Sequence, residues 1–126
     1  MFSHILLGTN DVPAAKKFYD AVMGTLGITS GDLNEEKQRV YYRSPNGSLI
    51  TTKPIDGNSA STGNISTVEF KCASAEQGKA SHEAVIVAGG TIREDPPGWR
   101  VDGNKKLFLA FVRDLDGNKL NAMFVE

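Results

Sequence analysis

Apolar and polar positions follow the same succession of patterns twice along the chain. Residues 2–9 are a short apolar run, which predicts a buried strand. Apolar side chains then recur at helical spacing from Val12 to Leu26, behind Asn10 and Asp11, which can cap a helix, and ahead of Gly27, which can end one. Three further runs predict strands, the last two joined by a tight turn at 45–47: residues 28–33, 39–44 and 48–54.

The second succession begins after a small, polar stretch at 55–63, which we interpret as a linker. A strand is predicted over 65–73, and Ser74 with Gln77 forms a capping box for a helix that runs to Ala88. The rest of this half predicts a short strand at 91–94, a long loop at 95–106, and a hairpin of strands at 107–113 and 119–125.

Two numerical offsets relate these halves. Adding 63 carries Ala21 and Val22 onto Ala84 and Val85, and adding 70 carries Arg43 onto Arg113. A duplicated unit with a loop insertion would show two such offsets. We therefore predict an α+β fold of two βαβββ repeats, each a curled mixed sheet with one helix on its outer face, around a central trough. The predicted organisation is a single domain, 1–126, with half one at 1–54, a linker at 55–63 and half two at 64–126.

Composition narrows the function classes. The net charge is −1, and no stretch concentrates Lys and Arg, which argues against a nucleic-acid partner. No apolar segment is long enough to span a bilayer, and no secretory signal is visible, so we expect a cytoplasmic protein without a membrane partner. The single cysteine, Cys72, excludes an internal disulfide and a cysteine-based zinc site.

Two stretches carry a resemblance to a known superfamily. The first is residues 4–11 together with Phe18 and Tyr19, and the second is 112–120, with the order Arg-Asp-x-Asp-Gly-Asn at 113–118. With these stretches the chain resembles the vicinal oxygen chelate superfamily, which includes glyoxalases, extradiol dioxygenases, and fosfomycin- and bleomycin-resistance proteins. The resemblance covers nearly the whole chain. It implies the fold predicted above and a homodimer, because related proteins commonly pair or swap halves.

The resemblance also implies positions for up to four metal ligands on the trough. His4 occupies the first position, and adding 63 to its number gives the counterpart in half two, Thr67. The last strand of half two supplies Asn121, and subtracting 70 from 121 gives the counterpart in half one, Thr51. Only His4 is a normal ligand, since hydroxyl and amide oxygens bind zinc or iron weakly. A site without a carboxylate would also hold magnesium or manganese poorly. We therefore expect no metal cofactor.

Strand alternation adds candidates for a ligand site in the trough. Glu69 shares a face with Thr67 and could meet His4 as an acid–base pair, the two being weak catalytic candidates; it could equally pair with Lys71 as a solvated carboxylate. Trp99 in the long loop could be a lid that stacks on a ligand, or could pack on the domain surface. The predicted ligand-binding residues are His4, Thr51, Thr67, Glu69, Trp99, Phe111, Asn121 and Met123.

Three functions stay open from the sequence. The leading one is a glyoxalase/bleomycin-resistance-like protein that binds a small organic molecule in the trough without the family's catalytic metal. The second is a lyase, isomerase or dioxygenase of the same superfamily, which would use a divalent ion (Zn, Mn, Fe or Mg) and replacement ligands. The third is a dimeric interaction module without a ligand. Whether the protein is an enzyme is left open.

Overall fold

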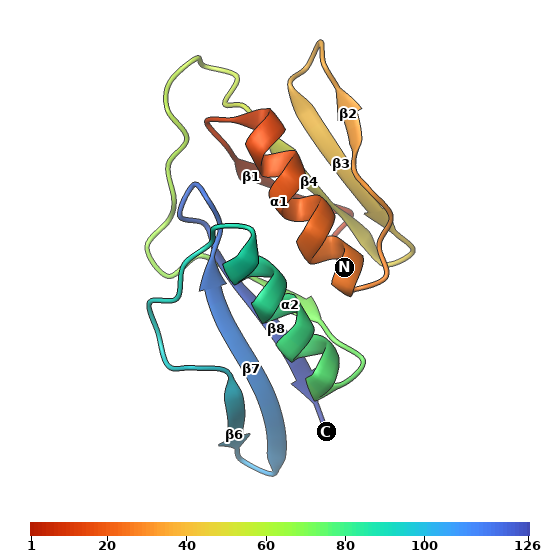
Figure 1. The fold of residues 1–126 in the computed structure, drawn as a ribbon, viewed down its shortest axis with the longest axis vertical. Coiled ribbons are helices and arrows are strands. Elements are labelled where there is room, and N and C mark those ends of the chain that lie inside the picture. The colour runs from red at the N-terminus through yellow and green to blue at the C-terminus, as the bar shows by residue number, and fades with distance from the viewer.

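Two four-stranded mixed sheets and two helices make up the fold in a computed structural model of residues 1–126 (Figure 1). The first sheet has the order β1-β4-β3-β2 and the second β5-β8-β7-β6, and in each the first and last strands pair in parallel. This confirms the predicted α+β fold of two βαβββ units. The elements are β1 (His4–Gly8), α1 (Val12–Thr25), β2 (Asp32–Asn34), β3 (Arg39–Ser44), β4 (Gly47–Thr52), β5 (Thr67–Lys71), α2 (Ala75–Val87), β6 (Gly98–Asp102), β7 (Lys105–Arg113) and β8 (Lys119–Val125).

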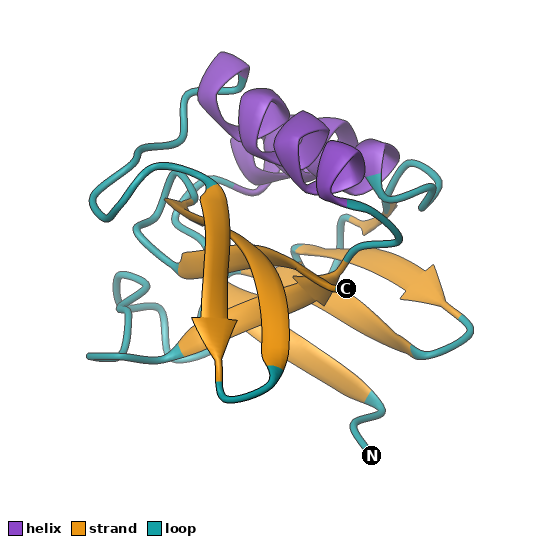
Figure 2. Ribbon diagram, turned by 90° about the horizontal axis from the view of Figure 1, so that it is seen from below, coloured by secondary structure: helices purple, strands orange, loops and turns teal.

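Both helices start at side-chain caps. The carboxylate of Asp11 accepts a hydrogen bond from the backbone N–H of Ala14 at 3.0 Å, and the hydroxyl of Ser74 accepts one from Gln77 N–H at 3.1 Å. Gln77 Oε1 in turn accepts from Ala73 N–H at 2.7 Å, one residue before the N-cap, so the predicted capping box forms with its return hydrogen bond shifted by one residue. Figure 2 shows both helices on the same side of the two sheets. Each sheet therefore has a helix face and an opposite face, which we call the trough face.

The structure corrects the prediction for the segment before β7. Of the strand predicted at 91–94, only an isolated bridge between Thr91 and Arg113 forms. Strand β6 instead lies inside the predicted loop 95–106, and a two-residue turn at Gly103 and Asn104 joins it to β7. Gly103 has φ +60°, the left-handed conformation that such a hairpin turn needs. The two prolines at 96 and 97, which have no N–H group, delay the strand to residue 98.

One hydrophobic core spans both halves. It contains Phe18 and Val22 of α1 and Tyr42 of β3, together with Val85 of α2 and Leu120 of β8. The two helices also pack directly against each other. The halves are therefore not independent domains, since each supplies part of the apolar surface that covers the other.

A buried polar contact crosses the same boundary. The Tyr19 hydroxyl of α1 donates a 2.6 Å hydrogen bond to the Asp114 carboxylate, just after β7. Burial, together with the nearby negative charge of Asp114, raises the pKa of Tyr19 well above its usual value. Asp114 also accepts from the backbone N–H groups of Asp116 and Asn118 at 3.0 and 2.8 Å. Asn118 Nδ2 in turn donates to the carbonyl oxygen of Gly8 at the end of β1, at 3.1 Å.

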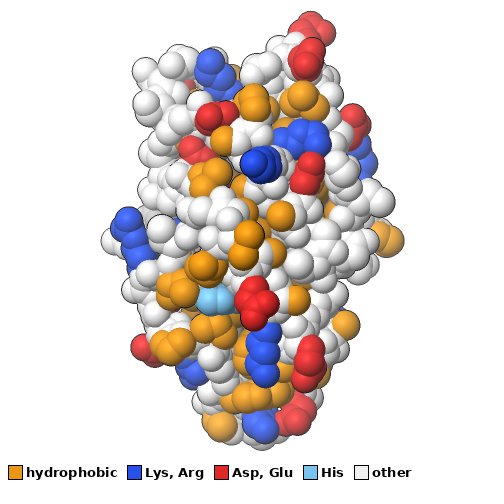
Figure 3. Space-filling model, viewed as in Figure 1, with side chains coloured by type: hydrophobic (Ala, Val, Ile, Leu, Met, Phe, Trp, Pro, Cys, Tyr) orange, Lys and Arg blue, Asp and Glu red, His pale blue; other side chains and the backbone are white.

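The helix-bearing surface carries charges of both signs in close alternation, with no broad area of either sign (Figure 3). A nucleic-acid interface needs a continuous basic face to offset phosphates, and this side of the molecule has none. Neither helix has the length and apolar character needed to cross a membrane.

We expect the substitution Tyr19→Phe to lower the free energy of unfolding by about 1.5–3 kcal/mol, because it removes a buried hydrogen bond to a charged group. Urea denaturation followed by circular dichroism measures this. Tyr41→Phe is the matched control: the Tyr41 side chain makes no hydrogen bond, so a change within about 0.5 kcal/mol is expected. Equal stability of the Tyr19 variant and the wild type would show that this contact does not hold the halves together.

Candidate functional site

The site lies in a slot between the two halves. Strands β1 and β5 are the edge strands of their sheets, and cavities lined by both strands occur at the two ends of the slot. The larger cavity has a volume of about 590 Å³. It is bounded by the start of β1, the end of α1, the β3–β4 hairpin and β5, so both halves contribute to it.

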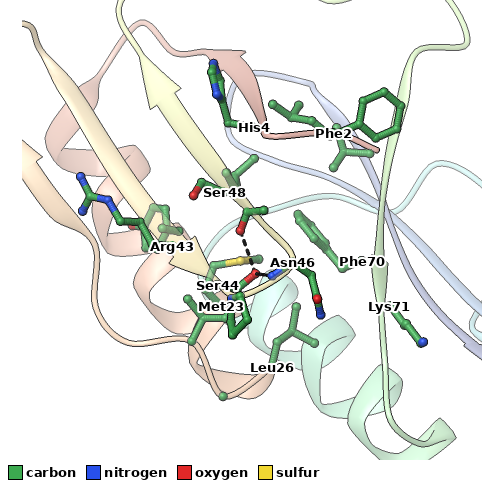
Figure 4. A pocket seen from close by; sticks show the side chains of 18 of the residues that line it. Phe2, His4, Met23, Leu26, Arg43, Ser44, Asn46, Ser48, Phe70 and Lys71 are labelled. Carbon is green, nitrogen blue, oxygen red and sulfur yellow. Dashed lines mark hydrogen bonds between the residues drawn. The ribbon is translucent and has the colours of Figure 1, made fainter.

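The interior of this cavity is apolar. Figure 4 shows Met23 on α1 and Leu26 directly after this helix, with Phe70 projecting toward them from β5. Phe2 stands at the mouth and is 70% exposed. Asn46 adds a neutral amide from the β3–β4 hairpin. Sequence reasoning missed this cavity, because the apolar positions at the end of α1 read as ordinary helix core.

A hydrogen-bond network fixes the chain segment that follows α1 and forms one wall of the cavity. The Asp20 carboxylate accepts hydrogen bonds from Lys16 Nζ at 2.7 Å, Tyr42 Oη at 2.9 Å and the Gly31 N–H at 2.8 Å. Burial alone would raise the pKa of Asp20, but these hydrogen bonds and one from Ser30 outweigh it and lower the pKa. Gly31 is required here, because a Cβ at this position would overlap the side chain of Val40 and approach the Tyr42 ring.

Polar and charged side chains from trough-face positions surround the opening: His4, Arg43, Glu69 and Lys71. Arg43 is already engaged, with Asp32 at 2.9 Å and the Tyr41 ring at 4.7 Å. Of the four, Lys71 alone makes neither a hydrogen bond nor an ion pair.

Two of the predicted site residues, His4 and Glu69, line this opening. His4 Nδ1 is 3.0 Å from the Ser3 hydroxyl, and Glu69 Oε1 accepts from Asn121 Nδ2 at 3.3 Å. No hydrogen bond joins His4 to Glu69, and no ion pair joins Glu69 to Lys71. The structure therefore forms neither of the two pairs predicted for Glu69.

The opposite end of the slot is crossed by the linker. Ala60 N–H donates to Asn10 Oδ1 at 2.7 Å, which holds the linker against the end of β1. The cavity left there is about 320 Å³ and is lined by Thr67 among others. The Thr67 hydroxyl donates to the carbonyl of Ile65 at 2.9 Å. The predicted site residues Thr67 and His4 therefore line different cavities.

Thr51 does not lie on the trough, so its predicted place beside His4 is wrong. Thr51 pairs with Leu7 and Val40, and Val40 belongs to the core under the helices. Offset 70 relates β3 to β7. Arg43 pairs with Ser48 across the first hairpin and Arg113 with Lys119 across the second, which is one residue longer between these paired positions, so β4 and β8 are related by 71. The counterpart of Asn121 is Ile50. A shift of one residue moves a side chain to the other face of a strand.

Trp99 is not a lid over the trough. It lies in β6 opposite Phe108, and its ring packs edge-on against Phe108 at 5.6 Å and Phe124 at 6.1 Å. Phe108 packs with Ala75 of α2, which places this aromatic group on the helix face. The alternative prediction, packing on the domain surface, describes its position.

The remaining predicted residues lie on the trough face of the second sheet. Asn121 is fully buried, and its Oδ1 accepts from the Ala110 N–H at 2.9 Å. Phe111 is half-buried beneath Lys119, whose Nζ lies 4.9 Å from the ring centroid. Met123 pairs with Leu109 of β7. Neither Phe111 nor Met123 lines the 590 Å³ cavity.

The four family positions do not suit a catalytic metal. After the register correction they are His4, Ile50, Thr67 and Asn121. Ile50 has no donor atom, the Thr67 hydroxyl is bound to a carbonyl, and Asn121 Oδ1 is taken by a backbone N–H. Divalent metals of this chemistry need several imidazole, carboxylate or thiolate ligands. Nowhere in residues 1–126 do three His, Cys, Asp or Glu side chains gather.

Comparison with known proteins identifies relatives by structure. A glyoxalase/bleomycin resistance protein from Albidiferax ferrireducens T118 shares 50% identity, with 98% of each chain covered and a TM-score of 0.93. A putative glyoxalase from Bacillus halodurans is similar in fold at 17% identity, with 98% of this chain and 95% of that chain covered and a TM-score of 0.76. No protein-family model and no curated protein sequence matches the chain.

These similarities define the class of protein. A chain of two paired βαβββ units that is half identical over its whole length to a family member shares that family's ancestry. The chain belongs to the glyoxalase/bleomycin resistance protein family, within the vicinal oxygen chelate superfamily.

Because the Thr51 hydroxyl is 1% exposed and has no hydrogen-bond partner, we expect Thr51→Val to raise the free energy of unfolding by about 1 kcal/mol. Chemical denaturation measures this. The matched control is Thr52→Val at the next position, where the hydroxyl accepts from Arg39 Nε at 3.1 Å, so a loss of stability is expected. Destabilisation by Thr51→Val would contradict the placement of its hydroxyl.

Proposed function

We propose that this protein binds a small organic molecule in the 590 Å³ cavity between its halves, without the catalytic metal of its family. The observation that carries the proposal is the cavity itself, which combines an apolar interior with polar groups at its opening. Ligand sites in proteins usually have volumes of about 300–1,000 Å³ and this composition. Membership of a family that includes a bleomycin resistance protein is in keeping with a binding role.

The arrangement suits binding by partial burial. The apolar part of a ligand would contact Leu26 and Phe70, which are partly exposed and from which it would displace water. Asn46 and Ser48, which lie beside them, offer neutral hydrogen-bonding groups that could orient the ligand. His4 and Glu69 would contact whatever part of the ligand projects onto the trough. No reaction step is assigned to these residues.

The second candidate, a metal-dependent lyase, isomerase or dioxygenase, would require ligands that the four family positions do not supply. The predicted homodimer stays a prediction.

We expect protein purified without chelator to contain far less than one equivalent of zinc, iron or manganese per chain, because the donor set is too weak to retain these ions. Inductively coupled plasma mass spectrometry of wild type and His4→Ala checks this. A full equivalent of one metal in the wild type that is lost in His4→Ala would reject the metal-free proposal and favour the enzyme.

We expect thermal-shift screening with a broad library of small aromatic and aliphatic compounds to give saturable stabilisation, and Leu26→Trp to abolish it by filling the cavity. Ile86→Trp on α2, which does not line the cavity, is the control for adding the same side chain and should keep binding. A flat response of the folded wild type across the library would leave the interaction module as the better hypothesis.

A further inference from the structure

Resting on the proposed function, we infer the chemical class of the ligand: an acid whose aromatic or similarly flat apolar body enters the slot while its carboxylate stays at the opening beside Lys71. Three features of the cavity lead to this class. They are the distribution of charge along its depth, the side chains that meet in its interior, and the hydrogen-bonding state of the groups around its opening.

Charge is confined to the opening of the cavity. The charged residues that line it, Arg43, Glu69 and Lys71, occupy trough-face positions of β3 and β5. The alternate positions of the same strands, which face the helices, hold Tyr42, Val68 and Phe70, and these are uncharged. Moving a charged group into such surroundings without a partner is costly. The part of a ligand that enters the slot is therefore uncharged, and any ionised group stays at the opening.

The interior favours an aromatic body. Phe70 and the thioether of Met23 line it together, with Leu26 beside them (Figure 4). Aromatic rings pair favourably with other rings and with methionine sulfur, beyond the area that they bury. Met23 is 1% exposed and belongs to the core, so it lies beneath Leu26 and Phe70 and supports the surface that a ligand would contact.

The hydrogen-bonding state of the opening selects the sign of the charged group. Arg43 forms an exposed ion pair with Asp32 at 2.9 Å, and the Glu69 carboxylate accepts a hydrogen bond from the Asn121 amide at 3.3 Å. Lys71 alone has no partner, although the Glu69 carboxylate lies on the same face of β5. A carboxylate at the opening would supply the missing partner of Lys71, whereas an ammonium group would add a second cation beside it.

Isothermal titration calorimetry with matched ligands tests this inference. The ligands are 2-naphthoate, 4-phenylbutyrate and phenylacetate, each compared with its amide and with the amine of the same carbon skeleton. In low salt we expect each acid to bind about threefold to fivefold more tightly than its amide, the range of a partly exposed ion pair, and the amine to bind most weakly. Added salt should reduce the preference for the acid.

Two lysine variants assign the effect. Lys71→Met should weaken acid binding to within about twofold of the amide and leave amide binding unchanged, because it removes the charge and keeps the apolar stem. Lys37→Met, on the exposed β2–β3 loop outside the cavity, should change neither. If Lys71→Met lowers the melting temperature of the free protein, Lys71→Gln replaces it in the same comparison.

The outcomes separate this inference from the proposed function. Equal binding of acids and amides, tighter binding of amines, or failure of the whole aromatic series while another library compound binds the wild type would each overturn the acid class and leave the binding function standing. An acid preference that persists in Lys71→Met would overturn the assignment to Lys71. If no compound of any class binds, the proposed function fails as well.

Discussion

The buried hydrogen bond between Tyr19 and Asp114 joins the two halves, and the slot lies between the halves that it joins. One partner lies on α1 and the other at the end of β7, in a region closed to water. Asp114 is also bound by the turn that follows it, and Asn118 of that turn reaches β1. A short chain of polar contacts therefore joins a helix of one half, a loop of the other and the first edge strand of the slot. Together with the shared core, this chain of contacts holds the two halves against each other.

The fold was predictable because its elements other than β6 have local signals in the sequence. The helical spacing from Val12, the capping box at Ser74 and the turn residues before β4 all act within a few positions of one another. The errors come from features in which one residue changes the outcome. Between paired residues, the β7–β8 hairpin is one residue longer than the β3–β4 hairpin. The counterpart of Asn121 is therefore Ile50 and not Thr51, and the two lie on opposite faces of β4. Trp99 was misplaced because the turn at Gly103 was overlooked in a stretch rich in proline and glycine.

The candidate site was less accessible to sequence reasoning, for a physical reason. His4 was predicted from the family resemblance and Glu69 from strand alternation, and both line the opening. Met23, Leu26 and Phe70 gave no signal of their own, because an apolar residue that lines a cavity and one that fills a core obey the same spacing rules. Whether such a residue lines a cavity or fills the core depends on how α1, the β3–β4 hairpin and β5 converge. These segments are brought together by packing between the halves. That His4 is the one usual metal ligand among the four positions taken from the family was visible from the sequence, because residue identity alone decides it.

The linker has a consequence for symmetry. In a chain of two similar halves, the slot between them has two similar ends. A single linker joins the halves, and it crosses one of these ends. Here it passes over the end of β1, where Asn10 secures it, and leaves the other end vacant. The cavity at the linker end is accordingly the smaller of the two, at about 320 Å³ against about 590 Å³. Which end the linker crosses follows from where the polypeptide is continuous. A circular permutant joined through the present termini and cut in the linker would carry the connection past the other end of the slot instead.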